Sequence, residues 1–298
     1  MNSINQVWKI CLYNFRGWKK NPRIVITFGL AFVLCFLLTD KAVRFSYEFD
    51  TIMQIAEPFV WTFGDSNSIL LASLLLILLF SDMPFLGAGI PYYLMRTSRF
   101  KWMLGQLLYI VLATFIYMLF ILISSIVICA KNSFSGNMWS KTGAILGYSS
   151  AGESIALPSS VKTMEMSTPY DCMLTIFLLM LLYTLLCVFI MFFFNLIKGK
   201  FWGVGSIFGF SIYGILLNPE IFKNALELTD EQMYIANVAT GWLSPLNHAT
   251  YHMHNFGYDL LPRLWQTYII YLVLILLFFI LSYFAVRKYN FKFTGGLE

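Results

Sequence analysis

Six long blocks of apolar residues limit what this chain can fold into more than any other feature of its sequence. A helix needs about 20 mainly apolar residues to cross the hydrocarbon core of a bilayer, and the blocks approach or exceed that length. The 298 residues are 59% hydrophobic and only 12% charged, whereas soluble domains carry about 25% charged residues. We therefore expect a polytopic membrane protein, and not a soluble enzyme, a disordered chain, a disulfide-stapled domain or a nucleic-acid-binding protein.

The blocks predict an all-α fold with six transmembrane helices. In lipid, backbone groups must pair within a helix or a closed barrel, and the sequence lacks the alternating segments of about ten residues that form barrel strands. We expect the whole chain, 1–298, to form one transmembrane domain. The predicted spans are 23–39, 59–81, 102–129, 172–197, 201–217 and 265–286.

The distribution of Lys and Arg predicts the orientation. If both termini are inside, thirteen basic residues lie in inner segments and seven in outer loops. We therefore expect a multi-pass protein of the cell membrane with both termini in the cytoplasm. Many of the basic residues cluster in the segments beside the predicted spans, so the net charge of +5 does not indicate a nucleic-acid partner. Of the two long outer loops, 130–171 is expected to be mostly irregular and 218–264 to contain one or two short helices.

The segment 1–22 has an amphipathic pattern of its own. Apolar residues recur at three-and-four spacing, with Lys9, Arg16 and Lys19 on the other face, which predicts a helix in the inner membrane interface. A signal peptide is the alternative, but no small-residue cleavage site follows Leu38. The apolar positions are Ile4, Val7, Trp8, Cys11, Leu12, Phe15 and Trp18.

The inner loop 82–101 has an acidic start, an amphipathic middle and a basic end. We expect a short helix along the membrane face that offers tyrosines and charges to a cytoplasmic partner. The alternative is an ordinary positive-inside connector between two spans. The predicted contact residues are Asp82, Tyr92, Tyr93, Arg96, Arg99 and Lys101.

This layout resembles the permease subunits of type-two ABC exporters, over essentially the whole chain. In that family an inner amphipathic helix leads into six spans, and an acidic residue opens a cytoplasmic coupling helix after the second span. Asp82 matches the acidic position, and 97–99 (Thr-Ser-Arg) matches the entry to the third span. The family more often has Glu followed by Gly-Thr, which Gly87 and Gly89 replace only loosely.

The resemblance implies that 82–101 docks on a cytoplasmic ABC ATPase and that two permeases, copies or paralogues, move together in the lipid bilayer. The chain has no G-x-x-x-x-G-K-S/T phosphate loop, since Gly199-Lys200 is followed by Phe201. We therefore expect a non-catalytic subunit with no cofactor of its own, and ATP and Mg on the partner.

Few buried charges and many aromatic residues favour an amphipathic or hydrophobic cargo, such as a peptide antibiotic, a lipid-linked compound or a drug. The direction of transport and the identity of the cargo do not follow from the sequence. Two other functions stay open. One is an ion-coupled secondary transporter or channel, and the other is a membrane immunity or scaffold protein without transport.

Asp65 is the clearest ionisable residue near a predicted span. Counting outward from Phe80 at about 1.5 Å per residue places it about 22 Å from the inner boundary of a core that is about 30 Å thick. We therefore expect it to face a partner helix or a wet vestibule on the substrate path. The alternative is that Asp65 caps a helix that begins outside.

Histidines and cysteines provide weaker candidates. His248, His252 and His254 share one outer loop, but the zinc-protease pattern would need Glu after the first of them, and Ala249 stands there. We expect a solvated loop or a short interfacial helix, and no metal ion. Two of the five cysteines, Cys129 and Cys172, flank the loop 130–171. These two residues either form a disulfide or are small buried apolar groups.

Overall fold

The structure is a computed structural model that describes residues 3–85, 97–149, 152, 157 and 160–289. Its described part is mainly helical, as the sequence predicted. The strands are two residues long and form one parallel pair, in which Met53 is opposite Ser133. These strands are β1 (Met53–Gln54) and β2 (Ser133–Phe134).

Four described helices are each long and apolar enough to cross a membrane, and two bent helix pairs meet the same limits when each pair counts as one span. The chain therefore has four to six candidate spans, and the six-span topology stays a prediction. The single helices are α2 (Pro22–Glu48), α6 (Arg99–Cys129), α10 (Pro169–Lys198) and α15 (Leu264–Lys288); the pairs are α3 (Glu57–Phe63) with α4 (Ser66–Phe80), and α11 (Lys200–Leu216) with α12 (Pro219–Ala225).

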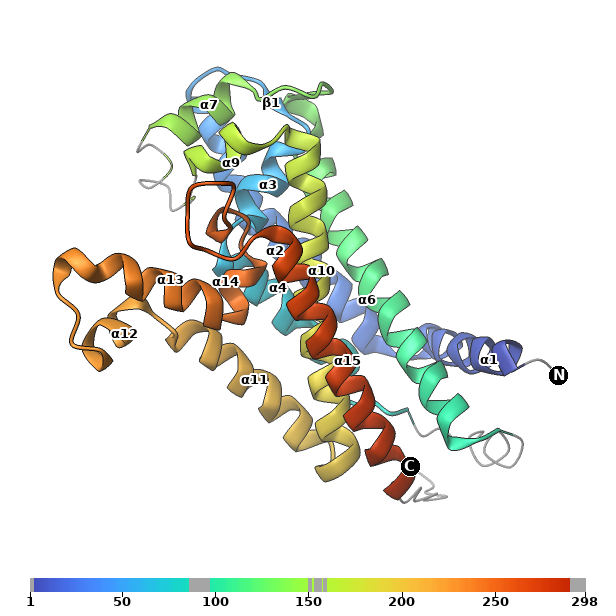
Figure 1. Cartoon of the computed structure of the whole chain (residues 1–298). Helices are drawn as coiled ribbons and strands as arrows, with labels where there is room; N and C mark the ends of the chain where they lie inside the picture. Colours follow the sequence, from blue (N-terminus) through green and yellow to red (C-terminus); the bar gives the residue numbers. More distant parts are fainter. Residues whose placement is uncertain (1–2, 86–96, 150–151, 153–156, 158–159, 290–298) are drawn as a thin grey trace.

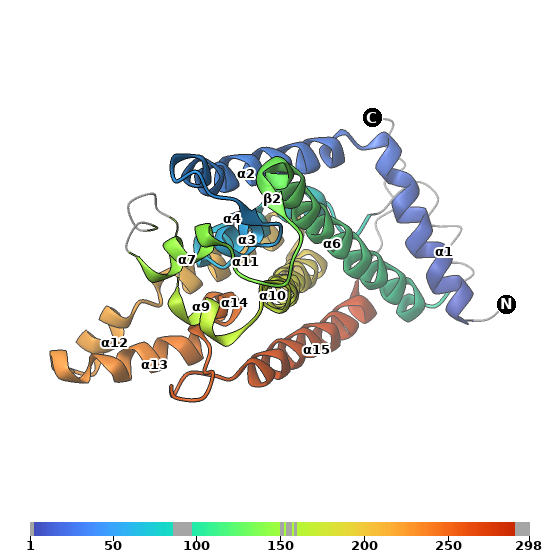
Figure 2. The ribbon, with the colours of Figure 1, turned by 90° about the horizontal axis from the view of Figure 1, so that it is seen from above.

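Helix α10 lies at the centre of the bundle and packs against α4, α6, α11 and α15, and α2 lies on the outer side of α4 and α6 (Figures 1 and 2). In its most apolar stretch 78% of the residues are buried, against 28% in α2 and 17% in α15. The two outer helices leave large apolar side chains exposed, such as Phe36 and Leu276. A helix that is apolar on all sides belongs in the interior, and exposed apolar faces suit contact with lipid.

The second apolar block, predicted as one helix over 59–81, is broken into α3 and α4, which meet at an angle of 86°. The break falls at Gly64 and Asp65. A Cβ on Gly64 would lie 2.5 Å from the Val60 carbonyl oxygen, so the bend requires glycine there. Asp65 has extended backbone and starts the next helix as its N-cap.

The helix that contains the first predicted span, 23–39, is longer than that span, because α2 continues to Glu48. The predicted span ends at 39, where charged residues begin with Asp40. In the structure Asp40 pairs with Arg44 one turn later on the surface of the same helix, with 2.6 Å between their charged groups. An i,i+4 pair of this kind supports a helix instead of ending it.

The N-terminal helix α1 (Ser3–Arg16) lies across α6 at the side of the bundle, and η1 (Gly17–Lys20) follows it (Figure 1). The crossing is close, because a Cβ on Gly105 of α6 would be 2.6 Å from the Ile10 Cβ. The helix agrees with the amphipathic pattern of 1–22. Its location in the membrane interface stays a prediction.

The two long connections contain more regular structure than the sequence predicted. In the first, 130–171, Ser140 caps a helix, and Leu146 packs with Met164 in a small apolar cluster. The Ser- and Gly-rich composition concealed these apolar residues. In the described part of the chain, the first connection contains η2 (Ala130–Asn132), β2, α7 (Lys141–Tyr148) and α9 (Val161–Met166). The second contains α12, η3 (Asp230–Gln232), α13 (Met233–Leu243), α14 (Pro245–Ala249) and η4 (Tyr251–Met253).

Candidate functional site

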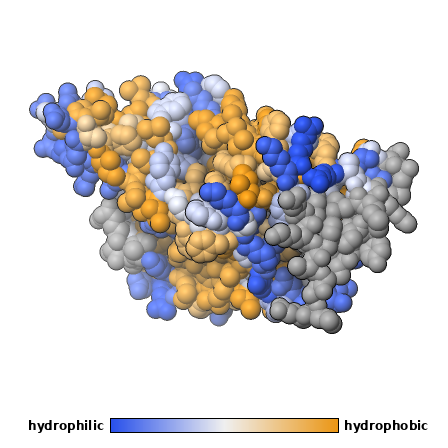
Figure 3. All heavy atoms as spheres, turned by 90° about the horizontal axis from the view of Figure 1, so that it is seen from below, coloured by the Kyte–Doolittle hydropathy of each residue, from blue (hydrophilic) through white to orange (hydrophobic). Residues whose placement is uncertain are grey.

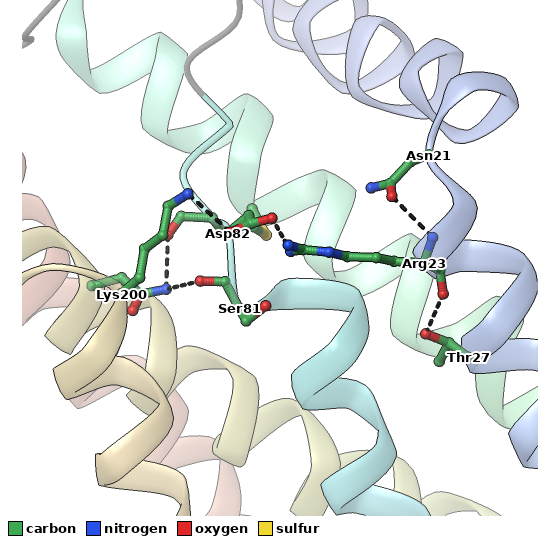
Figure 4. Close-up of polar contacts among 8 residues, drawn as sticks. Asn21, Arg23, Thr27, Ser81, Asp82 and Lys200 are labelled. Carbon is green, nitrogen blue, oxygen red and sulfur yellow. Dashed lines mark hydrogen bonds and ion pairs between the residues drawn. The ribbon is translucent and has the colours of Figure 1, made fainter. Parts of the chain in front are cut away.

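Asp82 lies two residues beyond the end of α4, where the sequence predicted the segment 82–101 to begin. Its carboxylate accepts a hydrogen bond from the Arg23 guanidinium and another, of 2.9 Å, from the Lys200 ammonium (Figure 4). Arg23 belongs to the first turn of α2, and Lys200 is the first residue of α11. One carboxylate thus joins the ends of three helices, and we call these three residues the Asp82 cluster.

The backbone around Arg23 is fixed by its neighbours. Pro22 is at the first position of α2, where its missing N–H costs no hydrogen bond. Asn21 Oδ1 accepts a hydrogen bond of 3.1 Å from Arg23 N, and Thr27 Oγ1 donates one of 2.7 Å to the Arg23 carbonyl (Figure 4). These contacts hold the start of α2 so that the guanidinium reaches Asp82.

Lys200 reaches the cluster because α10 and α11 are joined by a single residue. That residue, Gly199, has a φ of +91°. Glycine adopts this region without steric cost, whereas other residues rarely do. The sharp turn returns the chain along α10 and places Lys200 beside the end of α4.

Asn195, near the end of α10, holds the chain next to Asp82. Its Nδ2 donates a hydrogen bond of 2.7 Å to the carbonyl of Met83. Gly203 on α11 leaves the space that this amide occupies, because a Cβ there would be 1.8 Å from Asn195 Oδ1. Asn195 was not predicted as a site residue, although a polar side chain inside the apolar block 172–197 is a signal in the sequence.

The Asp82 cluster is open to water and contains one carboxylate and two cations. The exposed side-chain fractions are 33% for Asp82, 49% for Arg23 and 66% for Lys200. Ion pairs this exposed contribute about 0–1 kcal/mol each, so neither pair locks the helices together. A hollow of about 500 Å³ lies beside them, lined by residues of α2, α4 and α11. The ion pairs of this junction are therefore weak.

The basic end of 82–101 contacts other helices. Arg99 Nη1 donates a hydrogen bond of 2.6 Å to the Arg287 carbonyl in the last turn of α15, where carbonyl groups lack helical partners and a cation is favoured. Lys101 Nζ donates one of 2.9 Å to Gln6 Oε1 on α1. Seen from below, this end of the molecule has hydrophilic residues among hydrophobic ones (Figure 3). A role of either cation in binding a partner stays a prediction.

The other predicted site residues fall into two groups. Tyr92, Tyr93 and Arg96 lie outside the described residues. Asp65 is at the N-terminus of α4, and its Oδ2 accepts a hydrogen bond of 3.2 Å from Asn67 N. This is the capping geometry that the sequence left open as an alternative, and a place for Asp65 on a substrate path stays a prediction.

The sequence left a solvated loop or a short interfacial helix open for the histidines; His248 lies in the short helix α14, but neither His248 nor His254 is solvated. The exposed fractions of His248 and His254 are 3% and 0%, and both rings contact Thr267 on α15. The spacing of the histidines does not indicate that the connection 218–264 packs against α15. Among the residues that the structure describes, no group of three or more His, Cys, Asp or Glu is placed to hold a metal ion.

All five cysteines are described, buried and free. Cys129 packs with Ala42 and Met53 in a small cluster, whereas Cys172 belongs to the main core. The two residues therefore do not form the disulfide that the sequence allowed. They occupy the positions of small apolar side chains, which was the other interpretation.

Comparisons with models of protein families, with curated proteins and with solved structures found no match to this chain. Its function is therefore inferred from the residues and from the geometry described above.

Proposed function

We propose that this chain is the transmembrane permease subunit of an ATP-binding cassette transporter that moves an amphipathic or hydrophobic cargo across the cell membrane. The observation that supports this proposal is the Asp82 cluster. The segment 82–101 begins at a carboxylate that follows α4 and contacts α2 and α11. A cytoplasmic partner that displaces this segment would act on three helices at once.

The proposed energy source is on another chain. ATP and Mg bind to cytoplasmic ATPase subunits, because the permease sequence lacks a phosphate-binding loop. The proposed transporter also contains a second permease, either a copy of this chain or a paralogue. The water-exposed ion pairs of the Asp82 cluster suit this arrangement, because a weak junction can open and close in each cycle.

The proposed cargo follows from the surface of the helices. Large apolar side chains remain exposed along α2, α11 and α15, and the described spans bury few charged groups. A cargo that travels partly within the bilayer matches these surfaces better than a bulky ion does. Peptide antibiotics, lipid-linked compounds and hydrophobic drugs are the classes that we propose.

We expect the tagged chain, purified from its native host in mild detergent, to carry a soluble ATPase with the phosphate-binding loop that it lacks. ATP hydrolysis by the purified complex should rise when cargo is added. An unrelated tagged polytopic protein from the same membranes is the control. Reconstituted chain that moves cargo without any ATPase, driven by an ion gradient, would contradict the proposal and favour the secondary transporter.

We also expect an impermeant maleimide added to intact cells to label Met138→Cys but not Lys19→Cys. Both positions are exposed, Met138 with 67% of its surface, and in the proposed topology the first is outside and the second is cytoplasmic. Native thiols should add little background, because all five are buried and burial raises the pKa of Cys11 to about 11. The reverse labelling pattern would invert the topology and place 82–101 outside.

A further inference from the structure

His248, Thr267 and His254 form a continuous buried chain of polar contacts. Thr267 Oγ1 lies 2.9 Å from His248 Nδ1 and 3.0 Å from His254 Nε2. The other two ring nitrogens face backbone carbonyls: His248 Nε2 is 3.0 Å from the Trp242 oxygen, and His254 Nδ1 is 3.1 Å from the Tyr251 oxygen. The chain connects α13, α14 and η4 to the first turn of α15.

The number of protons decides how many of these four contacts are hydrogen bonds. A carbonyl oxygen only accepts, so the two nitrogens that face Trp242 and Tyr251 must carry hydrogens to bond there. In neutral rings the remaining nitrogens are then both acceptors, and both face the hydroxyl of Thr267. That hydroxyl has one hydrogen, so it satisfies one ring and leaves the other nitrogen facing an oxygen lone pair.

One additional proton removes this conflict. When one ring is an imidazolium, it donates to Thr267 Oγ1 while the hydroxyl donates to the other ring, and all four contacts are hydrogen bonds. A second proton would place two cations on one oxygen and leave the hydroxyl hydrogen without an acceptor. The arrangement therefore accommodates one extra proton and disfavours two.

We propose that His248, Thr267 and His254 form a binding site for a single proton, which the two imidazoles share through the threonine hydroxyl. Binding of the proton completes the chain and fastens α14 and η4 to the start of α15. The proposed source of the proton is the aqueous phase beside the connection 218–264. This site goes beyond the proposed transport function and does not depend on an ATPase partner.

Nearby groups set the pH at which the proton binds. Burial lowers the pKa of His248, while its hydrogen bond to the Trp242 carbonyl raises it. Burial lowers the pKa of His254 to about 4; the hydrogen bond to the Tyr251 carbonyl opposes this shift, and the charges of His248 and Lys162 add to it. The cluster is therefore neutral near pH 7 and takes up its proton on acidification.

Among the described residues, no carboxylate shifts the pKa of His248 or His254. The Tyr271 ring on α15 packs against His248 with 6.2 Å between ring centroids, and its hydroxyl donates a hydrogen bond of 2.7 Å to the Pro245 carbonyl. The charge of Asp65 acts on His252 instead. The charge of Asp171 at the start of α10 acts on Tyr251, and Asp259 forms an ion pair with Lys162 of α9. Other titratable groups on the packed elements include Cys172, Tyr183 and Cys187 on α10, Tyr251 and His252 on η4, Tyr268 on α15, Tyr234 on α13 and Glu165 on α9.

Nitrogen-15 NMR of the full chain in lipid nanodiscs, with labelled histidine, tests the proposal. Between about pH 8 and about pH 3 we expect His248 and His254 to change together in one step, with their protonated fractions summing to one proton. Thr267→Val should lower the pH of that step by about one to two units, a ten- to hundredfold loss of proton affinity, because the imidazolium loses its acceptor. Thr267→Ser, which retains a hydroxyl, should preserve the step.

His252 is the internal control, because it belongs to the same turn but makes no contact with Thr267 in the hydrogen bonds described. Its titration should not change in the Thr267 variants. Independent titration of the two buried rings, uptake of two protons, no step before unfolding, or an unchanged step in Thr267→Val would each overturn the proposal. If the valine variant does not fold, the count of protons in the unmodified chain decides the matter.

Discussion

Replacing Glu57 with alanine is expected to lower the free energy of unfolding by about 3–5 kcal/mol. The Glu57 side chain is fully buried, and its carboxylate accepts hydrogen bonds from Ser140 N at 2.6 Å, from Ser140 Oγ at 2.5 Å and from Gln54 N at 3.3 Å. Alanine removes the acceptor of three donors at once, and each buried donor without a partner costs about 1–3 kcal/mol. The contacts that hold α7 on α3 are lost with it.

Two further variants separate the carboxylate from its surroundings. Glu57→Gln keeps the shape and one carbonyl oxygen, so we expect a loss of about 1–2 kcal/mol. Glu165→Ala removes an exposed carboxylate from α9 in the same part of the molecule and should change the stability by less than about 0.5 kcal/mol. Denaturant unfolding of the purified chain in detergent, followed by tryptophan fluorescence, measures all three. Equal stability of Glu57→Ala and Glu165→Ala would show that Glu57 does not hold the first connection.

The helical class followed from the sequence because the length of an apolar block depends only on local composition. Helix ends were harder to place, since they depend on individual residues. Ser98 caps α6 and Pro169 starts α10, each about three residues before the predicted beginning of the apolar block. The bend at Gly64 was not predicted, because it requires a close contact with Val60 that the hydropathy pattern does not encode.

The candidate site was predicted only in part, for a reason of distance along the chain. Asp82 was identified from its place at the inner end of a span. Its partners Arg23 and Lys200 are 59 and 118 residues away along the chain. From the sequence, these two basic residues only supported the prediction that both termini are cytoplasmic. Their meeting depends on how α2 and α11 pack beside α4. For His248 and His254, polarity suggested exposure, whereas the fold supplied Thr267 as a buried partner.

The substitution Asp82→Lys is expected to reduce transport and cargo-stimulated ATP hydrolysis by more than tenfold while the chain still inserts and folds. The variant replaces two attractive contacts with three neighbouring cations. Each exposed pair contributes about 0–1 kcal/mol, and like charges about 4 Å apart in water repel by about 1 kcal/mol. The junction therefore changes by a few kcal/mol, and 1.4 kcal/mol already corresponds to a factor of ten in an equilibrium. The apolar contacts of α10 keep the bundle together.

A matched control comes from the same chain. Asp40 has an exposed fraction of 29%, close to the 33% of Asp82, and among the described residues its ion pair is with Arg44 of the same helix, α2. Asp40→Lys should therefore leave transport near its normal rate, because it breaks no contact between helices. Cargo export from cells and ATP hydrolysis by purified complex measure both variants, after membrane insertion has been checked by blotting.

A charge exchange decides whether the contact or the carboxylate itself matters. Combining Asp82→Arg with Arg23→Asp restores opposite charges between the end of α4 and the start of α2, although Lys200 loses its partner. Part of the lost transport should return if the cluster works by joining helices. If Asp82→Lys inserts normally and transports at the normal rate, the segment 82–101 is only a positive-inside connector. The proposal of an ATP-driven permease then loses the observation that supports it.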